Sequence, residues 1–183
     1  MQAQTVIVPL AEGFEEIEAI TIIDVLRRAD LDVQTVHLKD AHVSGAHRVS
    51  VKADKSIDAV DASHCALVCL PGGMPGSTNL LEDRRVIELL QKVDKAGGYV
   101  AAICAAPMVL AKAGLTKGKK ATCYPGFESK LDGAVITKAN VVVDGKLVTG
   151  NGPGGAVPLA LKLVELLRGP AVAKELANGL LWA

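Results

Sequence analysis

Short apolar runs, each the length of a buried strand, alternate with helical segments along this chain. The clearest are TVIVPL at Thr5–Leu10, CALVCL at Cys65–Leu70 and YVAAI at Tyr99–Ile103. Between the first two, residues 14–29 repeat apolar side chains with a helical period. Strands that are apolar on both faces are typical of parallel sheets covered by helices on each side. The sequence therefore predicts an α/β fold with a mostly parallel central sheet.

The remaining segments fit the same plan. No repeat, low-complexity tract or linker interrupts the chain, so residues 1–183 are expected to form a single domain. Asp144 and Gly145, within residues 141–148, mark a small β-hairpin. Further strands are expected at residues 33–38, 49–53 and 120–124, and further helices at residues 83–96, 107–113, 158–167 and 172–181.

Composition argues against several classes of protein. The chain has 20 Lys and Arg residues against 20 Asp and Glu, so no long-range field attracts nucleic acid, whereas a near-neutral surface is compatible with self-association. No apolar run approaches the ~20 residues of a membrane span, and no targeting segment is visible. With four cysteines and no secretion signal, we expect free thiols and a cytoplasmic protein.

Cys104 is the first candidate for chemistry. It follows the apolar run at Tyr99–Ile103 and precedes a helical segment, at the sheet edge where ligands bind in such folds. Its neighbours in AAICAAP are small, as a sharp strand-to-helix turn requires. A following helix N-terminus would lower the pKa of the thiol, so Cys104 is expected to be the one thiol with a depressed pKa. The alternative is a buried core cysteine, and local features do not separate the two.

Two other loops are expected at the same edge. In the first, Glu18 lies toward the apolar side of a helix start, where burial would raise its pKa and let it share a proton with a thiolate. The alternative, which the local sequence favours, is that Glu18 only complements the helix dipole. In the second, the backbone N–H groups of Gly72 and Gly73 suit an oxyanion hole, although an ordinary turn explains them as well.

No metal or cofactor site is predicted. Cys65 and Cys69 are four residues apart on one strand, where they should face the same side as core residues, and this is not zinc-ligand spacing. The glycine-rich GGMPGSTN lacks the ending of a phosphate-binding loop, and no dinucleotide motif is present. The histidines lie at positions 37, 42, 47 and 64, none next to Cys104 in sequence.

Four segments in register resemble the ThiJ/PfpI superfamily, and within it the branch of Parkinson disease protein 7 and YajL. They are the stretch at residues 11–33, LPGG at 70–73, AAICAAP at 101–107 and NGPGGA at 151–156. The resemblance implies a flavodoxin-like three-layer sandwich that forms a homodimer.

The resemblance also implies roles for individual residues. Cys104 matches the reactive cysteine of the family and Glu18 the carboxyl that hydrogen-bonds it. Gly72 and Gly73 match the loop facing the thiol, and Ala105 supplies the backbone N–H that follows the nucleophile. Two further positions, Arg28 and Arg48, match residues near the dimer interface and the mouth of the site.

Two departures from the family pattern narrow the range of activities that the resemblance implies. Ala105 stands where the protease-like members have histidine, so a peptidase triad is not expected. Tyr124 stands where the branch has a histidine before proline, which leaves Glu18 as the acid–base group and Tyr124 as a group that can orient a substrate.

The resemblance therefore implies a cysteine-dependent, glutathione-independent enzyme acting on methylglyoxal, glyoxal or their protein adducts, of the glyoxalase III or deglycase type. The alternative is a redox-sensing stress protein or chaperone in which Cys104 is oxidised to a sulfinate. A dimer with a vestigial site is a more remote possibility. Sequence alone does not separate the first two, because they use the same two residues.

Overall fold

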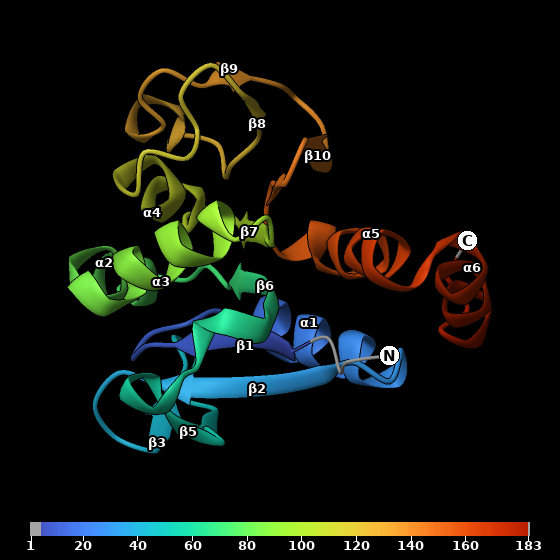
Figure 1. Ribbon diagram of the computed structural model, residues 1–183, viewed down its shortest axis with the longest axis horizontal. Helices are drawn as coiled ribbons and strands as arrows, with labels where there is room; N and C mark the ends of the chain where they lie inside the picture. The colour runs from blue at the N-terminus through green and yellow to red at the C-terminus, as the bar shows by residue number, and fades with distance from the viewer. Residues whose placement is uncertain (1–4, 183) are drawn as a thin grey trace.

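The computed structural model describes residues 5–182 and shows helices on both faces of a seven-stranded sheet (Figure 1). Its strands are β1 (Thr5–Leu10), β2 (Asp32–His37), β5 (Lys55–Ser56), β6 (Cys65–Leu70), β7 (Tyr99–Ile103), β10 (Val141–Asp144) and β11 (Leu147–Gly150). They lie in the order β10-β11-β7-β6-β1-β2-β5. Only the β10–β11 hairpin is antiparallel, and every other neighbouring pair is parallel. The predicted fold class is confirmed.

Residues 5–182 form six helices in two groups, each with its own core. One face of the sheet carries α1 (Glu16–Arg28) and α5 (Ala156–Arg168), with α6 (Pro170–Gly179) packed against α5, and the other carries α2 (Gly76–Glu82), α3 (Arg84–Lys95) and α4 (Pro107–Lys112). Along β1, Val6 and Val8 enter the first core while Ile7 enters the second. Both faces of the strand are therefore buried, which is why its sequence shows no polar alternation.

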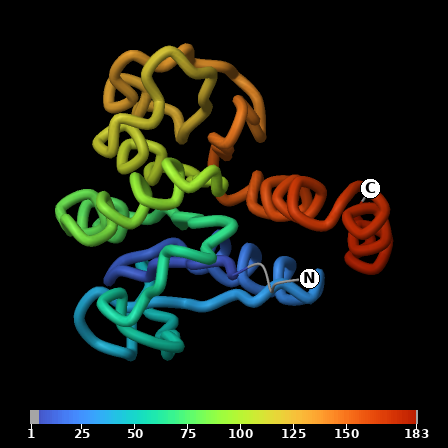
Figure 2. The backbone as a smooth tube through the Cα atoms, viewed as in Figure 1, coloured from blue at the N-terminus to red at the C-terminus, as the bar shows by residue number. Residues whose placement is uncertain are grey.

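The order in which the chain adds strands to the sheet reverses between β1 and β6. From β1 the chain steps outward to β2 and β5, then crosses back to β6 and β7 and reaches the edge strand β10, from which the hairpin returns to β11 (Figure 2). The carboxyl ends of β1, β6 and β7 lie side by side there, so their following loops meet at one edge. This is the position at which doubly wound sheets bind ligands.

Several local predictions differ from the structure. The strand expected at residues 49–53 is β4 (Ser50–Lys52), which pairs with β3 (His42–Ser44) outside the central sheet. The strand expected at residues 120–124 shortens to β8 (Lys120–Ala121), paired with β9 (Val135–Ile136), because the next backbone N–H donates to the Thr149 hydroxyl. Helix α2 was not predicted, because Pro75 and Gly76 at its start are typical of a turn.

Among residues 5–182, no helix combines the length and the apolar character that crossing a bilayer requires.

The prediction that Cys65 and Cys69 face the same side of their strand is wrong. Cys65 lies in the core under α3, and Cys69 lies in the core under α1. The register of β1 against β6 shifts between Thr5 and Val6, so the regular alternation of side chains begins only after Cys65.

Candidate active site

Cys104 lies on a sharp turn between β7 and α4. Its φ of +64° is in the left-handed region, which a non-glycine residue adopts only when its surroundings hold it there. Its N–H donates to Gly150 O at 3.0 Å, and its carbonyl accepts from Tyr124 N–H at 2.8 Å. Among the cysteines, Cys104 alone is partly exposed. The turn thus presents the sulfur at the edge of the sheet where the loops meet.

Glu18 is a fully buried side chain of α1 that reaches across to the loop after β6. Its Oε2 accepts a hydrogen bond from Gly72 N–H at 2.7 Å, and its Oε1 is buried with no hydrogen-bond partner in residues 5–182. A carboxyl that only complemented the helix dipole would be solvated at the start of α1. The contact with a residue 54 positions away instead places Glu18 beside Cys104.

The two glycines of the loop after β6 have different partners. Gly72 N–H is already bonded to Glu18, so it is not free to hold an oxyanion as predicted. The backbone N–H groups of Gly73 and Ala105 lie against the Cys104 sulfur and favour its thiolate. A Cβ at Gly72 would lie 2.6 Å from Cys104 Cβ and 2.7 Å from Glu18 Oε2, so only glycine fits between the two.

Burial governs the protonation of this pair. Desolvation raises the pKa of Glu18 to about 7. Burial, followed by the charge of Glu18, raises the pKa of Cys104 to about 12, even though the N–H groups of Ala105 and Gly73 oppose the shift. The prediction of a depressed thiol pKa is therefore wrong, because desolvation and a neighbouring carboxylate outweigh the turn and the short helix α4. Between these two values the pair holds one proton.

The other cysteines are core residues. Burial raises the pKa of Cys65 and of Cys123 to about 11, and raises that of Cys69 still further. All four thiols are free. None of the other three combines exposure with a carboxyl partner as Cys104 does.

The remaining predicted site residues lie further out. Tyr124 is 46% exposed, its ring lies next to Gly152, and its backbone N–H donates to the Cys104 turn. Arg28 pairs with Asp24 at 2.7 Å on the outer side of α1. Arg48 has a φ of +69° in the loop between β3 and β4. Neither guanidinium makes a hydrogen bond or ion pair with Glu18 within the described residues, and their interface roles stay predictions.

Sequence reasoning missed a cluster beside this site, formed by Glu15, Glu16 and His47. One ring nitrogen of His47 and one carboxylate oxygen of each glutamate lie within 4.8 Å of one another. The distance from His47 Nδ1 to Glu16 Oε2 is 2.9 Å. His47 and the acidic residues at the start of α1 are both visible in the sequence. More than 30 residues separate His47 from the two carboxylates, so no local pattern joins them.

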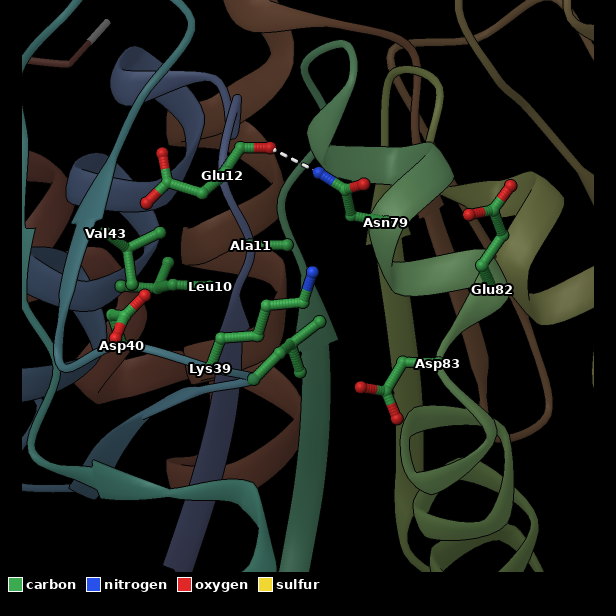
Figure 3. A pocket seen from close by; sticks show the side chains of 10 residues that line it. Leu10, Ala11, Glu12, Lys39, Asp40, Val43, Asn79, Glu82 and Asp83 are labelled. Atoms are coloured by element: carbon green, nitrogen blue, oxygen red, sulfur yellow. Dashed lines mark hydrogen bonds between the residues drawn. The ribbon is translucent and has the colours of Figure 1, made fainter.

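A separate cavity of about 240 Å³ opens at the same edge of the sheet, at the ends of β1 and β2 (Figure 3). It is lined by Leu10, Lys39 and Asp83 among others, but neither Cys104 nor Glu18. At its rim Asn79 Nδ2 donates to the backbone carbonyl of Glu12 at 2.8 Å, which ties the loop after β1 to α2. The cavity is therefore separate from the Cys104–Glu18 pair.

This chain is similar in sequence and in fold to known proteins over nearly its whole length. The chain is 40% identical to protein dj-1beta of Drosophila melanogaster, over 99% of this chain and 98% of that protein. It is 34% identical to the glutathione-independent glyoxalase DJR-1.2 of Caenorhabditis elegans, over 92% of this chain and 91% of that protein. The solved structure of Toxoplasma gondii DJ-1, oxidized, superposes with a TM-score of 0.95 at 40% identity, covering 99% of this chain and all of that one. Residues 4–166 match the model of the DJ-1/PfpI family, and the chain belongs to that family.

Proposed function

We propose that this protein is a glutathione-independent enzyme that converts small α-oxoaldehydes such as methylglyoxal and glyoxal to hydroxy acids, or removes their adducts from proteins. The observation that carries the proposal is the contact between Cys104 and the buried Glu18, which together hold one proton above about pH 7. The similarity to a glutathione-independent glyoxalase supports the same chemistry.

The pair has the groups that each step needs. The Cys104 sulfur adds to the aldehyde carbon and the aldehyde oxygen takes up the proton, giving a hemithioacetal. Glu18 removes the proton from that carbon and returns it to the neighbouring carbon, while the hydroxyl proton passes to the neighbouring carbonyl oxygen. The hemithioacetal thereby becomes a thioester with no outside oxidant. Water then cleaves the thioester and releases the hydroxy acid and the thiol. We assign the stabilisation of oxygen charge during these steps to the N–H groups of Gly73 and Ala105, because they act on the neighbouring Cys104 sulfur.

The second candidate is a redox sensor or redox-dependent chaperone. It is favoured by the partial exposure of Cys104 and by a carboxyl that can donate a hydrogen bond to a sulfinate. A solved relative described as oxidized adds support. This candidate needs no substrate and no turnover.

Steady-state turnover separates the two. Freshly reduced protein, given methylglyoxal without glutathione, should form lactate over many cycles, whereas a sensor would show at most one equivalent of thiol adduct. Mass spectrometry of the Cys104 peptide after peroxide, on the same preparation, measures sulfinate formation. Ready oxidation with no turnover would overturn the enzyme proposal in favour of the sensor.

We also propose a homodimer that works in a reducing, cytoplasmic setting, where free thiols such as these persist. Ile17 and Ile20 on the outer side of α1 are 59% and 43% exposed, and Val49 is 52% exposed. Such side chains support an interface along α1. Sedimentation should give twice the 19.0 kDa chain mass at micromolar concentration. A monomer at that concentration would contradict the proposal.

A further inference from the structure

His47 contacts two carboxylates at the start of α1 and has no role in the proposed function. Its Nδ1 lies 2.9 Å from Glu16 Oε2 and 3.7 Å from Glu15 Oε2. Its backbone N–H donates to Glu16 Oε1 at 2.7 Å, so both its ring and its main chain bind that carboxylate. The two carboxylates are shielded, with side-chain exposures of 13% for Glu15 and 10% for Glu16. Two shielded negative charges side by side favour a cation between them.

Glu15 connects this cluster to the reactive pair. Its backbone N–H donates to Gly72 O at 2.9 Å, and Gly72 N–H donates to Glu18 Oε2 at 2.7 Å. A single glycine thus separates the main chain of Glu15 from the Glu18 carboxyl. The charge of Glu15 opposes ionisation of Glu18 and contributes to the raised pKa of Glu18.

His47 is the group that can offset the negative charge of Glu15 and Glu16. Within residues 5–182, no Lys or Arg forms a salt bridge with Glu15 or Glu16. The groups that face Glu18 are Glu15 and the thiols of Cys69 and Cys104, and no Lys or Arg of residues 5–182 forms a salt bridge with it. The other titratable groups nearby are Glu12, which binds Ser44 N–H, and, on the β3–β4 segment, His42, Arg48 and Lys52.

We propose that His47 is a positioning residue of the Cys104–Glu18 site: as an imidazolium it binds Glu15 and Glu16, offsets their charge, and makes it easier for Glu18 to release its proton. The hydrogen bond to Glu16, together with the charge of Glu15, raises the pKa of His47 above 6.5. When the imidazolium loses its proton at higher pH, Glu15 is no longer compensated and Glu18 holds its proton more tightly. The inference rests on Cys104 and Glu18 being the reactive pair of the proposed function.

Titration of Glu18 in the variant His47→Gln tests the proposal. Glutamine keeps a hydrogen-bond donor for Glu16 but removes the charge. With ¹³C-labelled glutamate, the midpoint of Glu18 should rise by about 0.3–0.5 pH unit, the size expected for one partly screened charge. The shift should shrink at ~1 M salt. His47→Lys, which restores a cation, should return the midpoint toward the wild-type value. His42→Gln, on the neighbouring strand, should leave it unchanged.

The variant Glu15→Gln provides a second, independent test by the same titration of Glu18. It should lower the midpoint of Glu18, and His47→Gln in that background should have a smaller effect than alone, because the mediating charge is gone. An unchanged midpoint in a folded His47→Gln variant, or an equal shift in His42→Gln, would overturn the proposal. The readout is a titration and not turnover, so absence of oxoaldehyde turnover would count against the proposed function while leaving this test intact.

Discussion

Replacing Glu18 with glutamine should lower methylglyoxal turnover by about 10²–10⁴-fold, the usual contribution of a positioned acid–base group. Glutamine is nearly the same size and can keep the hydrogen bond from Gly72 N–H to its amide oxygen, so the turn around Cys104 should survive. It has no proton to exchange, and the transfer between the two substrate carbons should stop. Steady-state lactate formation by wild type and variant measures the loss.

The same variant should still form the sulfinate, because the glutamine amide can donate a hydrogen bond to it. Glu12→Gln, a carboxyl on the loop after β1 that instead binds Ser44 N–H, is the matched control and should stay within about two-fold of wild type. If Glu18→Gln keeps turnover within about ten-fold of wild type, Glu18 is not the proton carrier. Tyr124 and His47 then become the next candidates.

The pH profile expected for wild-type turnover follows from the same pair. Below about pH 7 both Glu18 and Cys104 are protonated, and the site has no base. As pH rises through the raised pKa of Glu18, the pair loses one proton and kcat/KM should increase to a plateau. In Glu18→Gln this rise near neutral pH should disappear, and any residual rate should follow the thiol alone.

Gly73→Ala should cost about 3–5 kcal/mol of unfolding free energy, a large value for one methyl group. Two effects add at this position. The φ of +90° is unfavourable for any residue with a Cβ. The added Cβ would also lie 2.3 Å from Glu15 N and 2.6 Å from Gly13 O. Both atoms belong to main chain, so the loop that carries Glu15 must move and the hydrogen bond from Glu15 to Gly72 should weaken.

Gly97→Ala separates the two effects. Gly97 ends α3 with a φ of +83°, but a Cβ there would meet nothing within 4 Å. That variant should lose only about 1 kcal/mol. Chemical denaturation of both variants at one protein concentration measures the difference. Equal losses would mean that the close contacts at Gly73 relax without cost, and that the loop is not rigidly packed.

Much of the fold could be predicted from local patterns. The apolar runs at Thr5–Leu10 and Tyr99–Ile103 are strands at those bounds, because a run of five or six apolar residues buried on both faces has few alternatives. Helix α2 and the pairing of β3 with β4 were missed, since a glycine-rich helix start and two three-residue strands carry almost no periodic signal. The candidate residues Cys104 and Glu18 came from strand-end position and from motif resemblance.

Local patterns and motif order were enough to predict the α/β class, the strand-to-helix turn at Cys104 and the family. Each depends on neighbours in the chain or on motifs in a fixed order. The interactions between these residues became visible in the three-dimensional fold: Gly72 N–H donates to Glu18, the pKa of Cys104 is raised, and His47 contacts Glu15. The reason is physical, since burial and the approach of charges from distant segments set a pKa, and neither is encoded in the local spacing of residues.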